Sequence, residues 1–249
     1  IGDCSLLLVA DDKRAGLVVV EAATGRAKHS LLMGISDKRP KWEELAHDDE
    51  GGYYVIGSRF FEEPSEEGAD KKTLAVPRLL RFRLQSDGGR ETSPVVDPES
   101  IIEWDITEAL VAAGYRRDVR RNEVNIEGLA VRTLRDPVGR LTLRELVVGL
   151  REPHDSARAY AANITVFPAP NAKLALYPLF RFDTGLRAGI PSHMSSLDYL
   201  PAWRGFFVLT STEDQDNRYH GNTLWFLSDD KIAAALPAGL PRDTVNLDD

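Results

Sequence analysis

Residues 42–59 read WEELAHDDEGGYYVIGSR, and related stretches occur twice more along the chain. The second, residues 126–152, reads IEGLAVRTLRDPVGRLTLRELVVGLRE, and the third, residues 195–214, reads SSLDYLPAWRGFFVLTSTED. Each stretch contains a short apolar segment, a turn and a second apolar segment of strand length, which is the pattern of a β-hairpin. A pattern repeated at this scale predicts a fold assembled from similar supersecondary units.

The spacing within the copies supports the repeat. Glu43 and Ser58 lie fifteen residues apart, as do Ser196 and Ser211, and the middle copy is longer, which is consistent with an insertion around Thr133–Thr142. At least one further strand is expected after each hairpin: Arg78–Leu84, Asn163–Phe167 and Asn222–Leu227. Three strands per copy are enough for a small antiparallel sheet.

A fourth, partial copy opens the chain. Leu6–Asp12 and Leu17–Glu21 match the later strands of a copy, and the last residues, Thr244–Leu247, could supply the missing leading strand. Small sheets that pack around a common axis form a β-propeller, and a last blade completed by both chain ends closes its ring. The sequence therefore predicts an all-β chain, a β-propeller in which residues 1–249 form a single domain.

The number of blades is less constrained than the fold class. Four copies in 249 residues leave roughly 60 residues for each, more than the 40–50 of a compact blade, so up to six blades would fit if some copies are degenerate. A sandwich or a barrel stays open but explains the repeat less well. Helices are expected only as short connectors, at Glu108–Ala113 after a Thr107 cap and at Lys231–Leu236 after an Asp230 cap.

Composition excludes several classes of protein. The chain carries 31 Lys and Arg against 39 Asp and Glu, a net charge of −8, which disfavours a nucleic-acid partner. No apolar run approaches the roughly 20 residues that span a bilayer, so no membrane partner is expected. Cys4 is the single cysteine, which excludes an internal disulfide and a multi-cysteine zinc site.

The chain opens Ile-Gly-Asp, with neither a methionine nor a signal-peptide pattern. This start is typical of a domain excised from a larger chain. The compartment is not determined by the sequence, although a cytoplasmic location is favoured over a periplasmic one.

Polar residues cluster where the expected strands end. In an antiparallel hairpin the first strand begins beside the end of the second. If the first strands line the propeller axis, these polar groups gather on one face, which we call the strand-end face and treat as the candidate binding site. Its residues are Asp11, Asp12, Glu43, Ser58, Arg59, Glu127, Arg151, Glu152, Ser196, Glu213 and Asp214.

Two interpretations of the strand-end face compete. Hard cations prefer oxygen ligands, so Asp12, Glu43, Glu127 and Glu213 could hold Ca²⁺. The guanidinium groups of the face could then bind a phosphate in bidentate fashion. Alternatively, the acids and arginines form salt bridges that fix one blade to the next, and this structural interpretation is favoured.

Five segments resemble a bacterial family known only as a domain of unknown function, which itself resembles the esterase-like phytase propellers. They are LVADD at 8–12, GGYYVIGS at 51–58, LLRFRL at 79–84, NIEGLA at 125–130 and VGLREP at 148–153. The resemblance covers most of the chain in order. It implies a β-propeller with Glu127 and Arg151 at positions of the family pattern, and it implies no particular activity.

Other chemistries have little support in the sequence. There is no Gly-x-Ser-x-Gly elbow, no paired-histidine metal motif and no glycine-rich nucleotide loop. The run from His193 to Asp198 contains the residue types of a catalytic triad, but residues adjacent on one strand alternate between its two faces. The four tryptophans, one near each repeat, are expected to pack between blades.

The sequence thus favours a non-catalytic recognition module, which binds a protein or a small ligand on the strand-end face. The partner would be another protein or another domain of the same chain. The alternative is a Ca²⁺-dependent phosphoesterase that uses the same face. A metal bound by three or more of these carboxylates would favour the enzyme, whereas arginine–carboxylate pairs with an apolar patch elsewhere would favour the interaction module.

Overall fold

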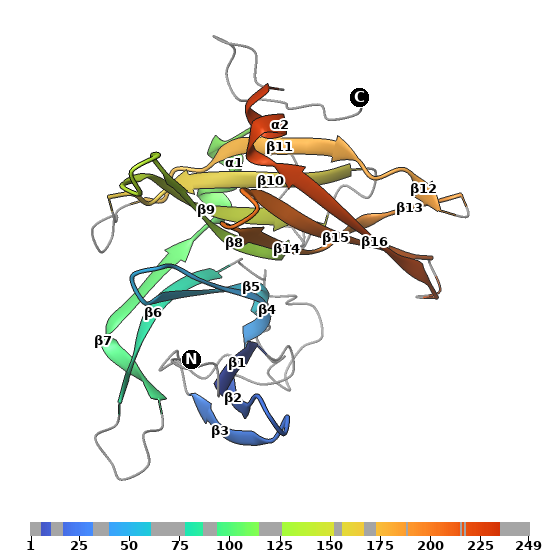
Figure 1. Ribbon diagram of the computed structural model, residues 1–249. Helices are drawn as coiled ribbons and strands as arrows, with labels where there is room; N and C mark the ends of the chain where they lie inside the picture. Colours follow the sequence, from blue (N-terminus) through green and yellow to red (C-terminus); the bar gives the residue numbers. More distant parts are fainter. Residues whose placement is uncertain are drawn as a thin grey trace. The chain divides into compact units, whose positions relative to one another are not determined.

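Two compact units make up the chain, which is shown as a computed structural model in Figure 1. Unit 1 comprises Ile1–Asp105 with Arg120–Asn122, and unit 2 comprises Ile106–Val119 with Glu123–Asp249. The structure describes residues 6–10, 17–31, 40–60, 78–86, 94–114, 126–151, 156–166, 173–187, 189–214, 216 and 218–234.

Unit 1 contains two antiparallel sheets. Blade 1 consists of β1 (Leu6–Ala10), β2 (Leu17–Glu21) and β3 (Ala27–Leu31). Blade 2 consists of β4 (Pro40–His47), β5 (Gly52–Phe60), β6 (Arg78–Ser86) and β7 (Pro94–Asp105). In both, each strand pairs with the next strand along the chain, which is the meander of a propeller blade.

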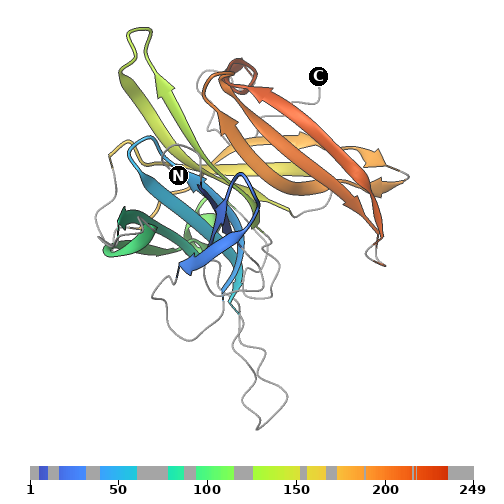
Figure 2. The same cartoon turned by 60° about the horizontal axis from the view of Figure 1, so that its bottom comes forward.

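Unit 2 contains two more sheets of the same kind, which Figure 2 shows from another side. Blade 3 consists of β8 (Ile126–Arg135), β9 (Leu141–Leu150), β10 (Ser156–Asn163) and β11 (Tyr177–Asp183). Blade 4 consists of β14 (His193–Leu200), β15 (Gly205–Glu213) and β16 (Tyr219–Ser228). The remaining elements are α1 (Thr107–Ala112), α2 (Asp229–Ala234) and a ribbon of β12 (Leu186–Arg187) and β13 (Ile190–Pro191).

The fold class predicted from the sequence is confirmed: the described chain is nearly all-β, and it has four antiparallel sheets of the propeller-blade type, two in each unit. Each of the three complete repeats gives the predicted hairpin, namely β4–β5, β8–β9 and β14–β15. The leading strand expected from Thr244–Leu247 lies outside the described residues. The two helices have six residues each, and neither is long and apolar enough to cross a bilayer.

The third strand of blade 3 differs from its prediction. It runs over Ser156–Asn163, whereas the expected strand, Asn163–Phe167, begins where β10 ends. Alanine is depleted in strands, so the alanine-rich sequence SARAYAAN gave no strand signal. Ala157, Ala159 and Ala161 are nevertheless buried, because small side chains suit the close packing of this strand in the core.

The starts of both helices also differ from their predictions. Ile106 is the N-cap residue of α1 and makes no side-chain capping bond, so Thr107 is the first helical residue and not the cap. In α2 the Ser228 hydroxyl accepts a hydrogen bond from the backbone N–H of Lys231 at 3.2 Å. Ser228 therefore takes the capping role predicted for Asp230, and the helix begins earlier than expected.

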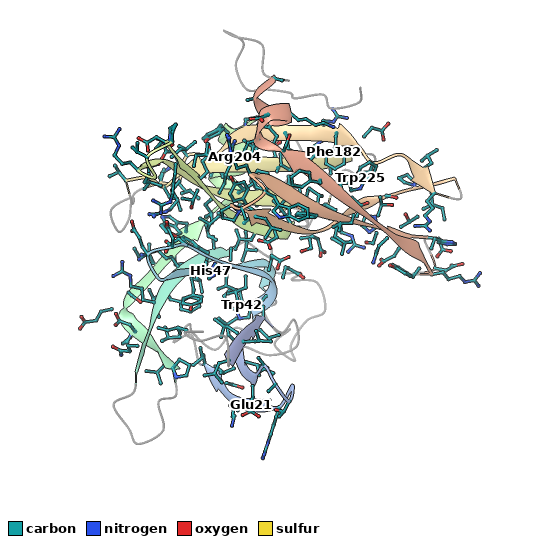
Figure 3. The ribbon with its side chains drawn as sticks, in the orientation of Figure 1. Glu21, Trp42, His47, Phe182, Arg204 and Trp225 are labelled. Atoms are coloured by element: carbon teal, nitrogen blue, oxygen red, sulfur yellow. The ribbon has the colours of Figure 1, made fainter. Side chains whose placement is uncertain are left out.

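Each unit has its own apolar core. In unit 1 the core is centred on Trp42, Val55 and Phe82, and Figure 3 shows Trp42 among the side chains of this unit. In unit 2, Phe182 packs against Trp225, with ring centroids 5.3 Å apart, and both are labelled in Figure 3. These two tryptophans pack as predicted. Trp203 does not, because it lies on the β14–β15 turn, where 64% of its surface is exposed.

A pair of facing glycines lets blades 3 and 4 approach closely. Gly128 and Gly149 are opposite each other on β8 and β9. A Cβ at Gly128 would lie 2.7 Å from the Cβ of Leu197 on β14, and one at Gly149 would lie 2.2 Å from the Sδ of Met194. The two glycines therefore have a packing function, because any side chain there would separate β8 and β9 from β14.

Substituting alanine for Gly128 is expected to destabilise unit 2. The new methyl group would collide with the Cβ of Leu197, which can move only with its backbone, so we expect the free energy of unfolding to fall by about 1–3 kcal/mol. Urea unfolding followed by tryptophan fluorescence measures the change.

Gly149→Ala is the matched control on the facing strand. We expect a smaller loss there, because the atom in the way lies near the end of the flexible Met194 side chain. Equal losses at the two positions would contradict this interpretation of the contact.

Candidate functional site

The first strand of three blades begins with the same irregularity. In the register of these blades the pairing shifts by one residue, and the bulged residues are Glu43, Glu127 and Ser195. A β-bulge re-aims its side chain away from the regular alternation of the strand. Three equivalent bulges therefore present three side chains at the strand-end positions predicted from the repeat.

The residue of the third copy is Ser195 and not Ser196, which was assigned to the site by equal spacing. The turn of the third hairpin is one residue longer than that of the first. Four residues separate the paired Leu200 and Gly205, whereas three separate Asp48 and Gly52, which are joined by a backbone hydrogen bond. Applying the fifteen-residue spacing of Glu43 and Ser58 to the third copy therefore gave Ser196, one residue beyond the bulge. Ser195 donates its hydroxyl to the backbone oxygen of Leu209, at 3.3 Å.

In unit 2 the strand-end face brings three of the predicted residues together. Arg151, which follows β9 directly, donates from Nη1 to Glu127 Oε1 at 3.2 Å. Its Nη2 donates to Glu213 Oε2 at 2.9 Å, and Glu213 is the last residue of β15. One guanidinium thus ties the bulge of its own blade to the second strand of the next.

The charge of this cluster follows from its members. One guanidinium faces two carboxylates, so the group has a net negative charge when all three are ionised. Arg151 and Glu127 are partly buried, and 34% of the Glu213 side chain is exposed. Partial burial strengthens ion pairs relative to fully solvated ones, because less water screens them.

Asp214 has a separate role, although it follows Glu213 in the sequence. Its Oδ1 accepts hydrogen bonds from the backbone N–H groups of Asp216 and Arg218, and its Oδ2 contacts His220 Nε2 at 3.0 Å. The bond to His220 and the two backbone donors lower the pKa of the Asp214 carboxyl. Asp214 therefore organises the loop between β15 and β16.

The remaining predicted residues are not placed in this cluster. Glu43 lies on β4 in unit 1, and Ser58 and Arg59 lie on β5, where the structure does not describe their side chains. Asp11, Asp12 and Glu152 lie outside the described residues. No three metal-binding side chains lie together in the described ranges, and both Glu127 and Glu213 are engaged by Arg151.

A second polar cluster, which the sequence analysis did not identify, is buried inside unit 2. Arg132 on β8 donates from Nη1 to Glu145 Oε2 on β9, and its Nε and Nη2 donate to Asp229 Oδ1 at the start of α2, all within 2.9 Å. Tyr199 donates its hydroxyl to Asp229 Oδ2 at 2.8 Å, and Tyr177 donates to Glu145. We call these five residues the buried network.

Burial and charge oppose each other in the buried network. Burial disfavours the charged form of Arg132, but the adjacent carboxylates of Asp229 and Glu145 outweigh it and raise the pKa of the guanidinium. Burial, together with the hydrogen bond to Asp229, raises the pKa of the Tyr199 phenol. Arg132 therefore stays charged and Tyr199 stays protonated across the physiological range.

The sequence contained one signal for the buried network. Arg132 directly follows an apolar run in β8, Glu145 directly precedes one in β9, and the two residues are direct partners in the register of these strands. Opposite charges facing each other across a hairpin indicate an ion pair. Asp229 and Tyr199 come from distant parts of the chain, so their place in the network could be recognised only in the tertiary structure.

Removing the Arg132 guanidinium is expected to be strongly destabilising. Arg132→Ala would remove the guanidinium that bonds to both buried carboxylates, Glu145 and Asp229, and we expect a loss of about 3–5 kcal/mol in the free energy of unfolding. Chemical denaturation measures it. Arg140→Ala, which breaks the solvent-exposed pair with Asp136, should cost much less, because water screens that pair.

Tyr199 also predicts how stability changes in alkali. The raised pKa means that the unfolded chain releases this phenolic proton near pH 10, before the folded protein does. The contribution of this phenol to the free energy of unfolding is complete below about pH 10. Above pH 10 it decreases, with a slope of up to about 1.4 kcal/mol per pH unit. We expect Tyr199→Phe to make the alkaline decrease in unfolding free energy shallower, as measured by urea titrations from pH 8 to 11.

Tyr219→Phe removes the hydroxyl of an exposed tyrosine and is the matched control. The same alkaline slope in Tyr199→Phe and in the wild type would show that the Tyr199 proton is not retained by the fold.

Comparison with known proteins adds little to this geometry. No family model and no curated protein matches the chain. Among solved structures, the chain is similar to Drosophila Semaphorin 1b, extracellular domains 1-2, with 8% sequence identity and a TM-score of 0.29. The match covers 90% of this chain and 63% of that one, so this chain spans less than two thirds of its length.

Proposed function

We propose that the chain is a non-catalytic recognition module, which binds a protein or a small ligand through the strand-end face of unit 2. The surface comprises Glu127, Arg151 and Glu213. The ligand group that best fits it is a cation, such as a lysine or arginine side chain of a protein partner or of another domain of the same chain.

The observation that carries the proposal is the double ion pair of Arg151. Both terminal nitrogens of its guanidinium are used by carboxylates of the protein itself. A phosphate could bind Arg151 only by displacing Glu127 or Glu213, and it would approach two carboxylates of its own sign. An incoming cation meets a net negative group instead, and Glu213 is partly exposed to receive it.

The alternative of a Ca²⁺-dependent phosphoesterase requires the same groups to act differently. The carboxylates would have to bind the metal while Arg151 binds the phosphate, but in the structure they bind each other. An apolar patch lies elsewhere, around Trp203 and Phe226 on blade 4. Arginine–carboxylate pairs combined with a separate apolar patch support the interaction module.

A peptide selection tests the proposal directly. We expect phage-displayed random peptides selected on the wild-type protein to be enriched in lysine and arginine. Glu213→Gln should weaken the binding of synthetic selected peptides at least about tenfold, because it removes a carboxylate that would receive the cation. Biolayer interferometry gives the affinities.

Asp136→Asn is the matched control, since Asp136 also pairs with an arginine but on an exposed turn away from this face. Its affinity for the peptides should equal that of the wild type. Selection of acidic or phosphorylated peptides, or phosphomonoester turnover in millimolar Ca²⁺ that is lost in Arg151→Ala, would overturn the proposal in favour of the enzyme.

A further inference from the structure

The outer edge of blade 4 is an unpaired strand in the described part of the chain. Blades 2 and 3 have a fourth strand outside the third, namely β7 and β11, whereas blade 4 ends at β16. One side of β16 pairs with β15 along almost its whole length, from Tyr219 to Ser228. Among the described residues no strand pairs with its other side (Figures 1 and 2).

Two side-chain contacts show which backbone groups point to the open side. The Thr223 carbonyl accepts a hydrogen bond from the Thr210 hydroxyl of β15, so it points inward. The neighbouring Asn222 carbonyl therefore points outward, and it accepts a hydrogen bond from Arg187 Nη1. Because these directions alternate along a strand, the N–H and C=O groups of Leu224 and Phe226 also point outward.

Apart from Arg187 at Asn222, this edge lacks the features that protect the other outer edges. The sequence of β16, YHGNTLWFLS, contains no proline and no Asp, Glu, Lys or Arg. In contrast, β3 contains Lys28, β7 contains Pro98 between two acidic residues, and β11 contains Pro178 and Arg181. Charges and prolines on edge strands prevent association with other chains, and their absence leaves an edge open to pairing.

An apolar surface lies beside the open edge. Leu224 and Phe226 are 62% and 40% exposed on the same face of β16. Phe226 packs against Phe207 and against the exposed Trp203, with ring centroids 5.1 and 5.9 Å apart. Exposed aromatic and aliphatic side chains gathered in one place mark an interaction surface.

We propose that this edge pairs with the same edge of a second copy of the chain. The two β16 strands would run antiparallel about a two-fold axis and join the two blades into one continuous six-stranded sheet. With the axis at Trp225, Leu224 of one copy lies opposite Phe226 of the other, so outward-pointing backbone groups meet and apolar side chains form cross-strand pairs. This interface is separate from the strand-end face and does not depend on the proposed function.

The uncharged sequence of β16 fits a second copy as the occupant. Each chain has a net charge of −8, so two copies repel each other over most of their surfaces. Between two β16 strands no like charges would face each other, because the strand contains no Asp, Glu, Lys or Arg. Its apolar face is also complementary to itself under two-fold symmetry.

Sedimentation equilibrium on the wild-type chain and on Leu224→Lys tests the proposal. We expect twice the monomer mass for the wild type at tens of micromolar protein, and at least a tenfold weaker association for Leu224→Lys, which places like charges near the axis. Leu224→Pro should also remove the dimer, since it deletes an outward-pointing N–H without breaking the pairing with β15.

Leu186→Lys introduces the same charge at an exposed leucine of the β12–β13 ribbon and is the matched control. It should dimerise like the wild type. Hydrogen exchange should show that the amides of Leu224 and Phe226 become protected as the protein concentration rises. A wild type that stays monomeric, or a dimer that survives both Leu224 variants, overturns the proposal, as does protection of these amides that appears only with a different protein.

Discussion

The buried Arg132 is the interaction on which the arrangement of unit 2 depends. Apolar packing is not directional, and it would tolerate small displacements of one sheet over another. A buried guanidinium tolerates none, since it must reach Glu145 on its own blade and Asp229 at the end of blade 4 at the same time. Misplacing either blade would leave charge buried without a partner, at a cost of several kcal/mol. The network therefore selects one packing of blades 3 and 4, and Gly128 and Gly149 make room for it.

At the strand-end positions three blades share the same backbone geometry but carry different side chains. A bulge recurs at the start of the first strand in three blades, but its residue is a glutamate in two of them and Ser195 in the third. The residue across the hairpin from the bulge differs as well, since Arg151 occupies a position equivalent to Ser58 and Ser211. At this position blade 3 combines a bulged acid with an arginine, whereas blade 2 has Ser58. The repeat supplies the scaffold, and one blade carries the specialised polar group.

The sequence predicted the hairpins well because their apolar segments and turns are local signals. It also predicted that Glu127, Arg151 and Glu213 lie on one face, because the strand ends of adjacent hairpins meet whatever the length of the loops between them. The predictions from sequence failed where the structure depends on contacts between distant parts of the chain. The strand rich in alanine had no local preference for β structure, the position of Ser195 depended on one extra residue in a turn, and the site of Asp229 depended on how α2 packs. The exposure of Trp203 likewise depended on its place on the turn between β14 and β15, where its ring contacts Phe207 and Phe226.

The two surfaces proposed for unit 2 lie far enough apart to act together. Glu213 and Trp203 flank opposite ends of β15, which has nine residues, and a strand rises by about 3.3 Å per residue. The strand-end face and the aromatic end of the blade are therefore separated by roughly 25–30 Å. Pairing through β16 would leave both strand-end faces of a dimer accessible, so such a dimer would present two equivalent binding surfaces. A weak ligand contact at each could then give tight attachment to a partner that displays two cationic groups, because the second contact forms within the complex.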